Sequence, residues 1–310
     1  MPRSIDPPAR APVRSQTPRF SAGTVGAVVL ALIVIPCFVT LPWSLRKYDD
    51  QRLAEGMHLQ PPSYSQPLGT DGLARSMLWR CLLGGAISLG IGITSAAISV
   101  SIGVTWGALA GYIGGRTDAI LMRIVDVLYG LPYILLVVLL DLAIKPWTES
   151  RIELLYPNAA AGVADVITLL LAIGGISWLT MARVIRGQVL SLRAQPFIEA
   201  ARACGSGRGR IFFLHLLPNL VGPIVVYATL TVPVAILQES FLSFLGIGVQ
   251  LPLPSWGNLG AEGTAQIHAI AQRWWLLLWP CVLLGLTLMS LNFLGEAMRD
   301  RLNPHGSPRT

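Results

Sequence analysis

The feature that most constrains this chain is a stretch of 35 residues, 81–115, that contains no Asp, Glu, Lys, Arg or His. A helix needs about 20 mostly apolar residues to cross a bilayer, so this stretch predicts a membrane span at about 81–111. Only 13% of the 310 residues are charged, whereas soluble domains contain roughly 25%. We therefore expect an all-α integral membrane protein, and a soluble enzyme, a coiled coil and a disordered chain are excluded.

Five further apolar segments have the length of a span, which makes six transmembrane helices in all. They lie at 22–43, 127–144, 166–182, 218–237 and 274–294. The segment at 22–43 is longer than the apolar region of about 7–15 residues in a signal peptide, and no A-x-A site follows it, so we expect a retained helix. An N-terminal tail at 1–21, an outer loop at 44–80, a core at 81–304 that holds the other five helices and a short tail at 305–310 complete this division.

The distribution of basic residues predicts the orientation in the membrane, because Lys and Arg are enriched in cytoplasmic loops. With the N-terminus inside, fifteen of the 23 basic residues are cytoplasmic and eight are outside. Both termini are therefore expected in the cytoplasm. The net charge of +7 does not indicate a nucleic-acid partner. Such a partner requires basic residues clustered on one soluble face, whereas here they lie in the segments between the apolar spans.

Metal, disulfide and nucleotide chemistry have no sequence support in this chain. The four cysteines and four histidines are isolated from one another, and the span-forming segments hold cysteines as small apolar residues. A phosphate-binding loop of the form GxxxxGK[ST] is absent, because the only lysines are Lys47 and Lys145, after Arg and Ile. We therefore expect no catalytic residues, no metal and no cofactor bound by this chain.

Small residues recur every fourth position in the second span, at Ser99, Gly103, Gly107 and Gly111. This spacing places them on one helix face, where a neighbouring helix backbone can approach closely. Helix packing is the simpler interpretation of this stripe, and a lining for a pore is the alternative.

The segment 183–217, between the fourth and fifth spans, contains a short helix. Pro196 suits its first turn and Gly205 its C-terminal end. Four residues share one face by their spacing: Phe197, Ala200, Ala201 and Cys204. Two interpretations stay open at this point, a helix on the membrane surface and a helix that docks into a groove of a partner protein.

The segments expected on the outer side of the membrane contain further candidate functional residues. Asp71 lies just before the second span, as part of a turn or of a contact with another protein. The segment 251–258, with Trp256, predicts a rigid non-helical loop and a candidate outer gate. Gln238 and Glu239, at the end of the fifth span, either face a translocation path or make hydrogen bonds at the membrane interface.

Several segments resemble one family in matching order. The sequence E-A-A at 199–201, Gly205 and H-L-L-P at 215–218 resembles the EAA loop of permease subunits in binding-protein-dependent ABC importers. Within these it is similar to the second, C-type permease of the dipeptide/oligopeptide/nickel branch. The other matching segments are LGTD at 68–71, AGYIGG at 110–115, MRIVD at 122–126, SFLGIG at 243–248, PSWGN at 254–258 and RDRLNP at 299–304.

The resemblance implies a type I ABC importer permease that moves peptides or similar small solutes across the cytoplasmic (inner) membrane by alternating access. It implies a second permease in a heterodimer, two ATP-binding subunits that use ATP and Mg²⁺, and an extracytoplasmic substrate-binding protein. The helix at 196–205 then contacts the ATPase through Phe197, Glu199, Ala200, Ala201 and Gly205. The alternative from another class is a secondary transporter or channel that works without ATP, for which no paired mid-membrane charges are found.

Overall fold

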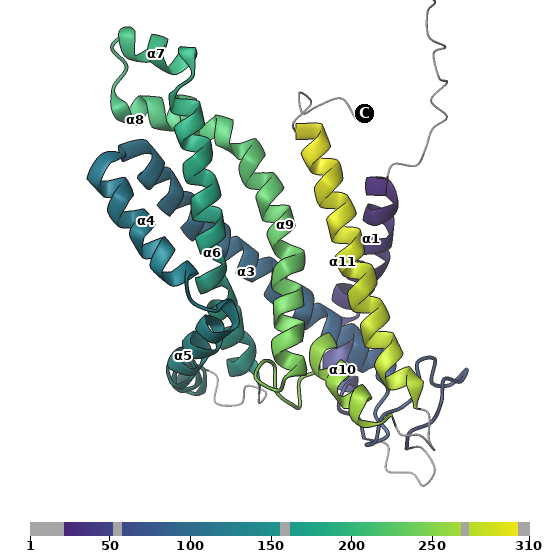
Figure 1. Cartoon of the computed structure of the whole chain (residues 1–310). Helices are drawn as coiled ribbons and strands as arrows, with labels where there is room; N and C mark the ends of the chain where they lie inside the picture. The colour runs from purple at the N-terminus through teal and green to yellow at the C-terminus, as the bar shows by residue number, and fades with distance from the viewer. Residues whose placement is uncertain (1–21, 52–57, 156–161, 268–272, 303–310) are drawn as a thin grey trace, which may run out of the picture.

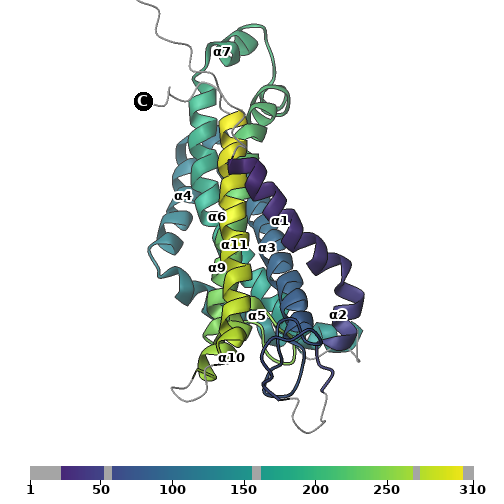
Figure 2. The same ribbon diagram turned by 90° about the vertical axis from the view of Figure 1, so that its right-hand side faces the viewer.

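The computed structural model describes residues 22–51, 58–155, 162–267 and 273–302. Apart from one isolated bridge between Thr70 and Ser76, the regular structure of these residues is helical (Figures 1 and 2). The helices are α1 (Ala22–Val39), α2 (Leu41–Lys47), α3 (Met77–Ile113), α4 (Gly115–Tyr129), α5 (Tyr133–Leu155), α6 (Val163–Arg193), α7 (Pro196–Ala203), α8 (Arg208–Arg210), the π-helix η1 (Ile211–Leu216), α9 (Leu217–Phe244), α10 (Trp256–Ala265) and α11 (Trp274–Leu302). The tails at 1–21 and 305–310 lie outside the described residues.

The expectation of an all-helical membrane protein is confirmed. Among the described residues, five helices are long and apolar enough to span a membrane, and α4 with α5 makes a sixth span if this bent pair is counted as one. Five of the segments expected from sequence therefore correspond to α1, α3, α6, α9 and α11. Several of these helices are longer than the apolar segments that predict them, since α3 begins at Met77 and α6 continues to Arg193.

The span expected as one helix at 127–144 is instead divided. The axes of α4 and α5 meet at 96°, with the break at residues 130–132. Pro132 disfavours helical backbone in the residue before it, and Gly130, next to that residue, stabilises a helix poorly. The polypeptide therefore turns here within an apolar segment.

A second difference concerns the segment 251–258, which was expected to be non-helical throughout. Helix α10 begins inside it, at Trp256. Ser255 and Asn258 form a capping box, in which the side chain of each accepts a hydrogen bond from the backbone N–H of the other. This reciprocal pairing satisfies two N–H groups that the first turn of a helix leaves free.

The small-residue stripe of α3 packs against α6. A Cβ atom added at Gly107 would collide with the carbonyl oxygen of Ala182, and one at Gly103 or Gly111 would meet backbone or side-chain atoms of α6. Ser99 is also buried. Helix packing is therefore the role of the stripe, and α3 and α6 form the centre of the fold.

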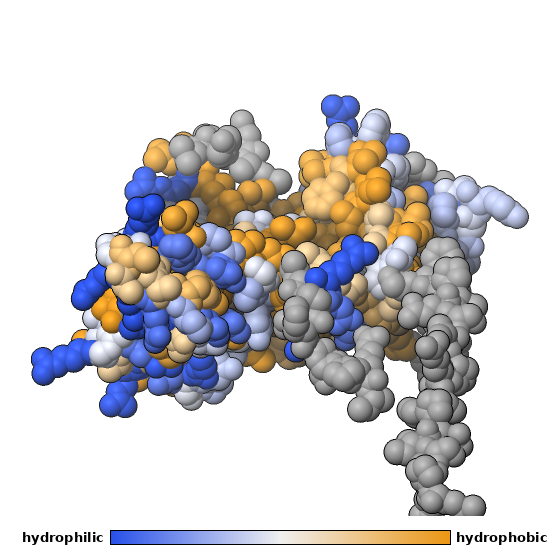
Figure 3. Space-filling view, turned by 90° about the horizontal axis from the view of Figure 1, so that it is seen from above, coloured by the Kyte–Doolittle hydropathy of each residue, from blue (hydrophilic) through white to orange (hydrophobic). Residues whose placement is uncertain are grey.

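The molecule has two distinct ends. Helix α7 lies at one end, together with the beginning of α1 and the end of α11, and α2 and α10 lie at the other (Figures 1 and 2). Helices α1 and α11 run side by side. Figure 3 shows the molecule from the end that carries α7. Hydrophilic residues gather on the side where α7 lies, and hydrophobic residues line a hollow in the middle of this view.

Candidate functional site

Helix α7 is delimited by strong local signals. Gln195 has extended backbone, and Pro196 occupies the first turn. At the other end, the Gly205 N–H donates to the Arg202 carbonyl and the Ser206 N–H to the Ala201 carbonyl. These two bonds, with Gly205 at φ +78°, form a Schellman motif. A left-handed residue is required at this position, which explains glycine there.

The inner face of α7 is held by one buried side chain. Ile198 is fully buried against Ile211 and Leu216 of η1, and Ala201 packs partly on the same cluster. Phe197, Glu199 and Ala200 are exposed. The face expected to unite Phe197, Ala200, Ala201 and Cys204 is thus divided: Ala201 faces the protein, while the other three face outward. The outward residues of α7 and its cap also include Pro196 and Ala203.

Polar contacts connect the loop that carries α7 to the end of α3. The Tyr112 hydroxyl donates to the Arg208 carbonyl at 2.6 Å, and Arg193 Nη1 donates to the Gly111 carbonyl at 2.7 Å. Tyr112 also packs against Phe212 in η1. These contacts join the end of α3 to α8, to η1 and to the end of α6.

Two ion pairs join α4 to α6. Arg186 makes a two-pronged pair with Asp118, with distances of 2.5 and 2.6 Å. Arg183 pairs with Asp126 at 2.9 Å and lies over the ring of Tyr129. Planar pairing of this kind is specific to arginine.

At the opposite end, Asp71 builds an ionic cluster with Arg75, Arg80 and Glu262. One oxygen of Asp71 accepts from the backbone N–H groups of Leu73 and Arg75, and the other from Arg75 Nε at 2.7 Å and Arg80 Nη1 at 2.8 Å. Arg80 is fully buried and also pairs with Glu262. Asp71 therefore acts as the centre of a turn that is fixed to both α3 and α10.

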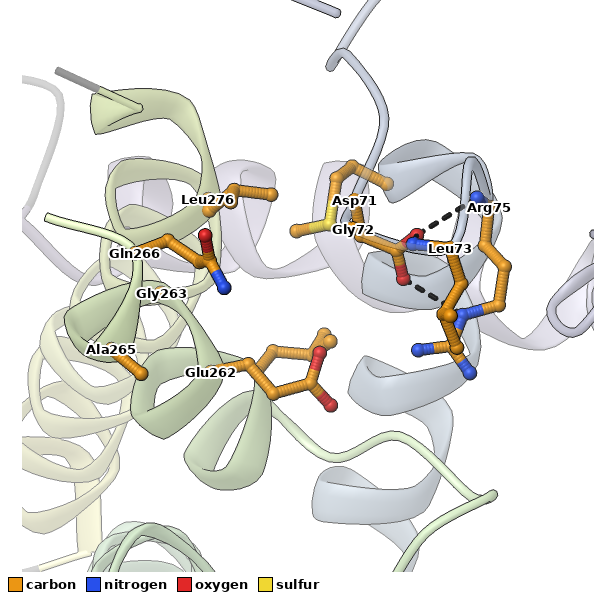
Figure 4. A pocket seen from close by; sticks show the side chains of 11 residues that line it. Asp71, Gly72, Leu73, Arg75, Glu262, Gly263, Ala265, Gln266 and Leu276 are labelled. Carbon is orange, nitrogen blue, oxygen red and sulfur yellow. Dashed lines mark hydrogen bonds and ion pairs between the residues drawn. The ribbon is translucent and has the colours of Figure 1, made fainter. Parts of the chain in front are cut away.

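A cavity of about 220 Å³ adjoins this cluster, between the turn and α10 (Figure 4). The side chains of Glu262 and Gln266 extend from α10 toward the turn that holds Asp71 and Arg75. Arg75 continues the cluster outward by pairing with Asp49 at 3.1 Å. Burial, and then the charge of Asp49, raise the pKa of the Tyr48 phenol, so this side chain is neutral at physiological pH.

Glu239 and Trp256 lie at a junction of α3, α9 and α10. The carboxylate of Glu239 is fully buried and accepts from the hydroxyls of Ser240 at 3.1 Å and Ser243 at 2.8 Å. Ser88 and Ser255 also hydrogen-bond with it. The indole N–H of Trp256 donates to the Cys81 carbonyl at 3.0 Å.

Gln238 points to a different neighbour. The Tyr133 hydroxyl, at the start of α5, donates to Gln238 Oε1 at 2.6 Å and lies 3.1 Å from the Ser177 hydroxyl of α6. Adjacent residues of α9 thus belong to separate polar clusters, because neighbouring positions on a helix face about 100° apart.

The structure therefore separates the candidate residues into groups. Phe197, Glu199, Ala200, Ala201 and Gly205 lie at one end, and Asp71, Glu239 and Trp256 at or near the other. Sequence reasoning missed Ile198, Arg80 and Glu262. A single arginine directly before the long uncharged stretch was the signal available for Arg80. No group of three or more His, Cys, Asp or Glu suited to a metal occurs among the described residues.

Comparison with known proteins identifies the family. Residues 103–306 match the model of the family described as "Binding-protein-dependent transport system inner membrane component". The chain belongs to this family. It is a permease subunit of an ABC importer, and its family implies partnership with ATP-binding subunits and a substrate-binding protein. The alternative of an ATP-independent transporter is thereby removed, and the chain is a transport subunit instead of an enzyme.

Individual relatives are similar to this permease over most of its length. The oligopeptide transport system permease protein OppC of Haemophilus influenzae is 40% identical over 92% of this chain and 85% of its own. The dipeptide transport system permease protein DppC of Bacillus subtilis is 42% identical over 79% of this chain and 70% of its own. The OppC of Escherichia coli is 40% identical over 90% and 86%.

A solved structure shares the fold. A chain of the MetNI methionine ABC transporter, in an inward facing conformation, superposes with a TM-score of 0.54 and 21% identity. The match covers 73% of this permease and 97% of that chain. At this level of identity the likeness establishes the architecture alone.

Proposed function

We propose that this permease carries short peptides, dipeptides or oligopeptides, across the cytoplasmic membrane, and that an ATP-binding subunit docks on the outward face of α7. The peptide cargo is supported by the relatives, whose names are oligopeptide and dipeptide permeases. Docking is supported by one observation: the exposed residues of α7 are mostly small or apolar, while its opposite face is fixed by buried Ile198.

In this proposal, the end of the molecule that carries α7 is cytoplasmic. The first described residue of α1 and the end of α11 lie at the same end as α7 (Figure 1), so the tails attached to them are also cytoplasmic. The excess of basic residues on this side agrees with the assignment. The α10 end then faces the substrate-binding protein.

A complete transporter requires further subunits. Two ATP-binding subunits bind ATP and Mg²⁺, and a second permease, a different chain, completes a heterodimer around the translocation path. Closure of the ATP-binding subunits moves the two α7 loops together and shifts the permeases between inward-open and outward-open states. Phe197, Glu199, Ala200, Ala201 and Gly205 are the residues assigned to transmit this movement; Ala201 and Gly205 shape the helix, and the other three contact the ATPase.

The docking face is tested with Ala200→Glu. Ala200 is exposed at the centre of the outward face, and a glutamate there places a bulky charge in the contact. In proteoliposomes with the complete complex, we expect peptide uptake and peptide-stimulated ATP hydrolysis to fall at least tenfold, which corresponds to about 1.4 kcal/mol of lost contact. Ser191→Glu is the matched control, because Ser191 is exposed near the end of α6 and outside α7, and it should keep both activities.

Two further outcomes would overturn the proposal. Equal activity of Ala200→Glu and Ser191→Glu would remove α7 from the coupling contact. Purification of the tagged chain in mild detergent tests the partners directly: recovery of an ATP-binding subunit and a second permease is expected, and recovery of the chain alone would contradict the assembly. Uptake of labelled peptides by the wild-type complex tests the cargo.

A further inference from the structure

The break between α4 and α5 leaves non-helical backbone inside a membrane-spanning pair. Residues 130–132 connect two helices whose axes differ by 96°. Non-helical backbone at membrane depth is tolerated only where protein buries it or where it lines a cavity that admits water. The contacts around this break therefore indicate which of these cases applies.

A cavity of about 250 Å³ lies at the break. It is open on one side and bordered by the end of α4, the start of α5 and the middle of α6, and Leu131 in the break is one of its lining residues. Four lining residues carry hydroxyl groups, Tyr129, Tyr133, Ser177 and Thr180, and the remaining lining residues are leucine or isoleucine. No charged residue lines it.

Gln238 of α9 is not one of the lining residues, but a hydrogen bond from the lining residue Tyr133 joins it to the cavity. Tyr133 donates to Gln238 Oε1 and lies beside the Ser177 hydroxyl. Within the part of the chain that the structure describes, no hydrogen bond is found for the side-chain nitrogen of Gln238, and this residue is only half-buried. Polar side chains inside a membrane protein are costly and mark substrate pathways.

We infer that this cavity is a cargo subsite that hydrogen-bonds the backbone of a peptide in transit. The inference rests on the proposed peptide cargo. Each peptide unit offers one donor and one acceptor, and the Gln238 amide and the Ser177 and Thr180 hydroxyls offer both kinds of group. The leucine and isoleucine residues of the lining carry no charge and accept apolar side chains of different shape.

The size of the cavity agrees with a segment of the cargo. Sites for whole small molecules measure about 300–1,000 Å³, and 250 Å³ lies below this range. The cavity is therefore suited to one part of a peptide, and the remainder of the peptide extends along α6 and α9. A side chain of the second permease is the competing occupant.

Site-specific photocrosslinking separates the two occupants. The photoreactive residue p-benzoylphenylalanine replaces Leu131, which is 46% exposed in the break, in a complex that first proves active in ATP hydrolysis. Illumination during turnover with a radiolabelled tripeptide is expected to attach the peptide to this chain. The same replacement at Leu32, on exposed α1, should give no peptide adduct. Crosslinking of position 131 to the second permease, or to lipid only, would overturn the inference.

Uptake by variants provides a second measurement. With saturating peptide-loaded binding protein, we expect Gln238→Leu and Tyr133→Phe to reduce uptake about fivefold to tenfold, the effect of losing one hydrogen bond. Thr231→Val is the matched control on α9, because the Thr231 hydroxyl bonds to the Tyr227 carbonyl of its own helix, and its uptake should not change.

A cargo analogue excludes a purely structural role of Gln238. A tripeptide with one amide replaced by a thioamide offers a weaker acceptor to the Gln238 side-chain N–H, and the wild-type complex should carry it more slowly than the amide. Gln238→Leu should carry both at the same rate. Equal discrimination by wild type and variant would show that Gln238 does not contact the backbone. Failure of the wild-type complex to import any peptide would instead refute the proposed function.

Discussion

Arg80 and Glu262 join the beginning of α3 to α10 through two parallel hydrogen bonds of 2.6 and 2.8 Å. The two residues are 182 positions apart in the chain, and Asp71 contacts the same arginine from the preceding turn. Because Arg80 is completely buried, these two carboxylates compensate the cost of removing its positive charge from water. The ionic cluster is therefore a main determinant of how the α10 end is held together.

Removal of Asp71 should destabilise the protein strongly. Asp71→Ala withdraws the acceptor of two arginines and two backbone N–H groups, and breaking a buried pair from one side costs about 3–5 kcal/mol. The free energy of unfolding, measured by titration with a denaturing detergent, should fall by about 3 kcal/mol. Asp50→Ala is the control, because Asp50 is an exposed aspartate. An equal loss in both variants would refute a special role for Asp71.

Gly205 should be replaceable only by residues that tolerate left-handed backbone. At φ +78°, alanine is strained by about 1–2 kcal/mol, so Gly205→Ala is expected to lower peptide-stimulated ATP hydrolysis by the complete complex. Gly205→Asn should retain more activity than Gly205→Ala, because asparagine visits this conformation more readily. Gly209→Ala, in α8 with open space around it, should behave like wild type. Equal activity of the alanine and asparagine variants at position 205 would contradict this explanation.

The contact between α3 and α6 predicts a position-dependent effect of adding one methyl group. Gly107→Ala places its Cβ against the Ala182 carbonyl, and overpacking of this kind costs about 1–3 kcal/mol. The thermal unfolding midpoint in detergent should drop. Gly90→Ala lies in the same helix with nothing near the added atom and should cause no drop. A similar decrease at both positions would mean that helix flexibility, and not packing, decides the result.

We expect the hydrogen bonds between Glu239 and its serine neighbours to keep water out of the junction of α3, α9 and α10. Val249 is 2% exposed near this junction, and its N–H donates to the Ser243 hydroxyl. In a background with exposed Cys204 and Cys281 changed to serine, Val249→Cys should react slowly with a water-soluble thiol reagent. Adding Glu239→Ala should accelerate labelling severalfold, since the loss of a buried acceptor costs about 1–3 kcal/mol.

The conservative variant completes this measurement. Glu239→Gln preserves the volume and one acceptor oxygen, so its labelling rate should stay closer to that of the parent. If the alanine and glutamine variants label at the same unchanged rate, Glu239 does not hold this junction. If both accelerate equally, both acceptor oxygens of Glu239 are required.

Sequence predicted the number and approximate position of the spans, because a bilayer demands a long apolar segment and charge interrupts it. It did not predict the break at 130–132, because proline alone is a poor marker here. Pro36, Pro223, Pro233 and Pro280 all lie inside continuous helices. Gly130 near Pro132 does not mark the break by itself either, because Gly222 directly precedes Pro223 inside continuous α9.

The helix at 196–203 was predictable from its ends, and its orientation was not. Pro196 and Gly205 act through local backbone preferences that the sequence displays directly. Which face turns inward depends on Ile211 and Leu216, and a helix of two turns has too few residues for its own pattern to decide. Burial of Arg80 was hidden for a similar reason, since its partner Glu262 lies far along the chain.

The uninterrupted course of α6 has a mechanical consequence. With 31 residues and no proline, it is a rod about 46 Å long at 1.5 Å per residue. A tilt of about 5° at one end displaces the other by about 4 Å over that length. Helix α9, with Pro223 and Pro233 inside it, is built to flex instead. Under the proposed coupling, we therefore expect a push on α7 to displace the far ends of α6 and α9 by different amounts.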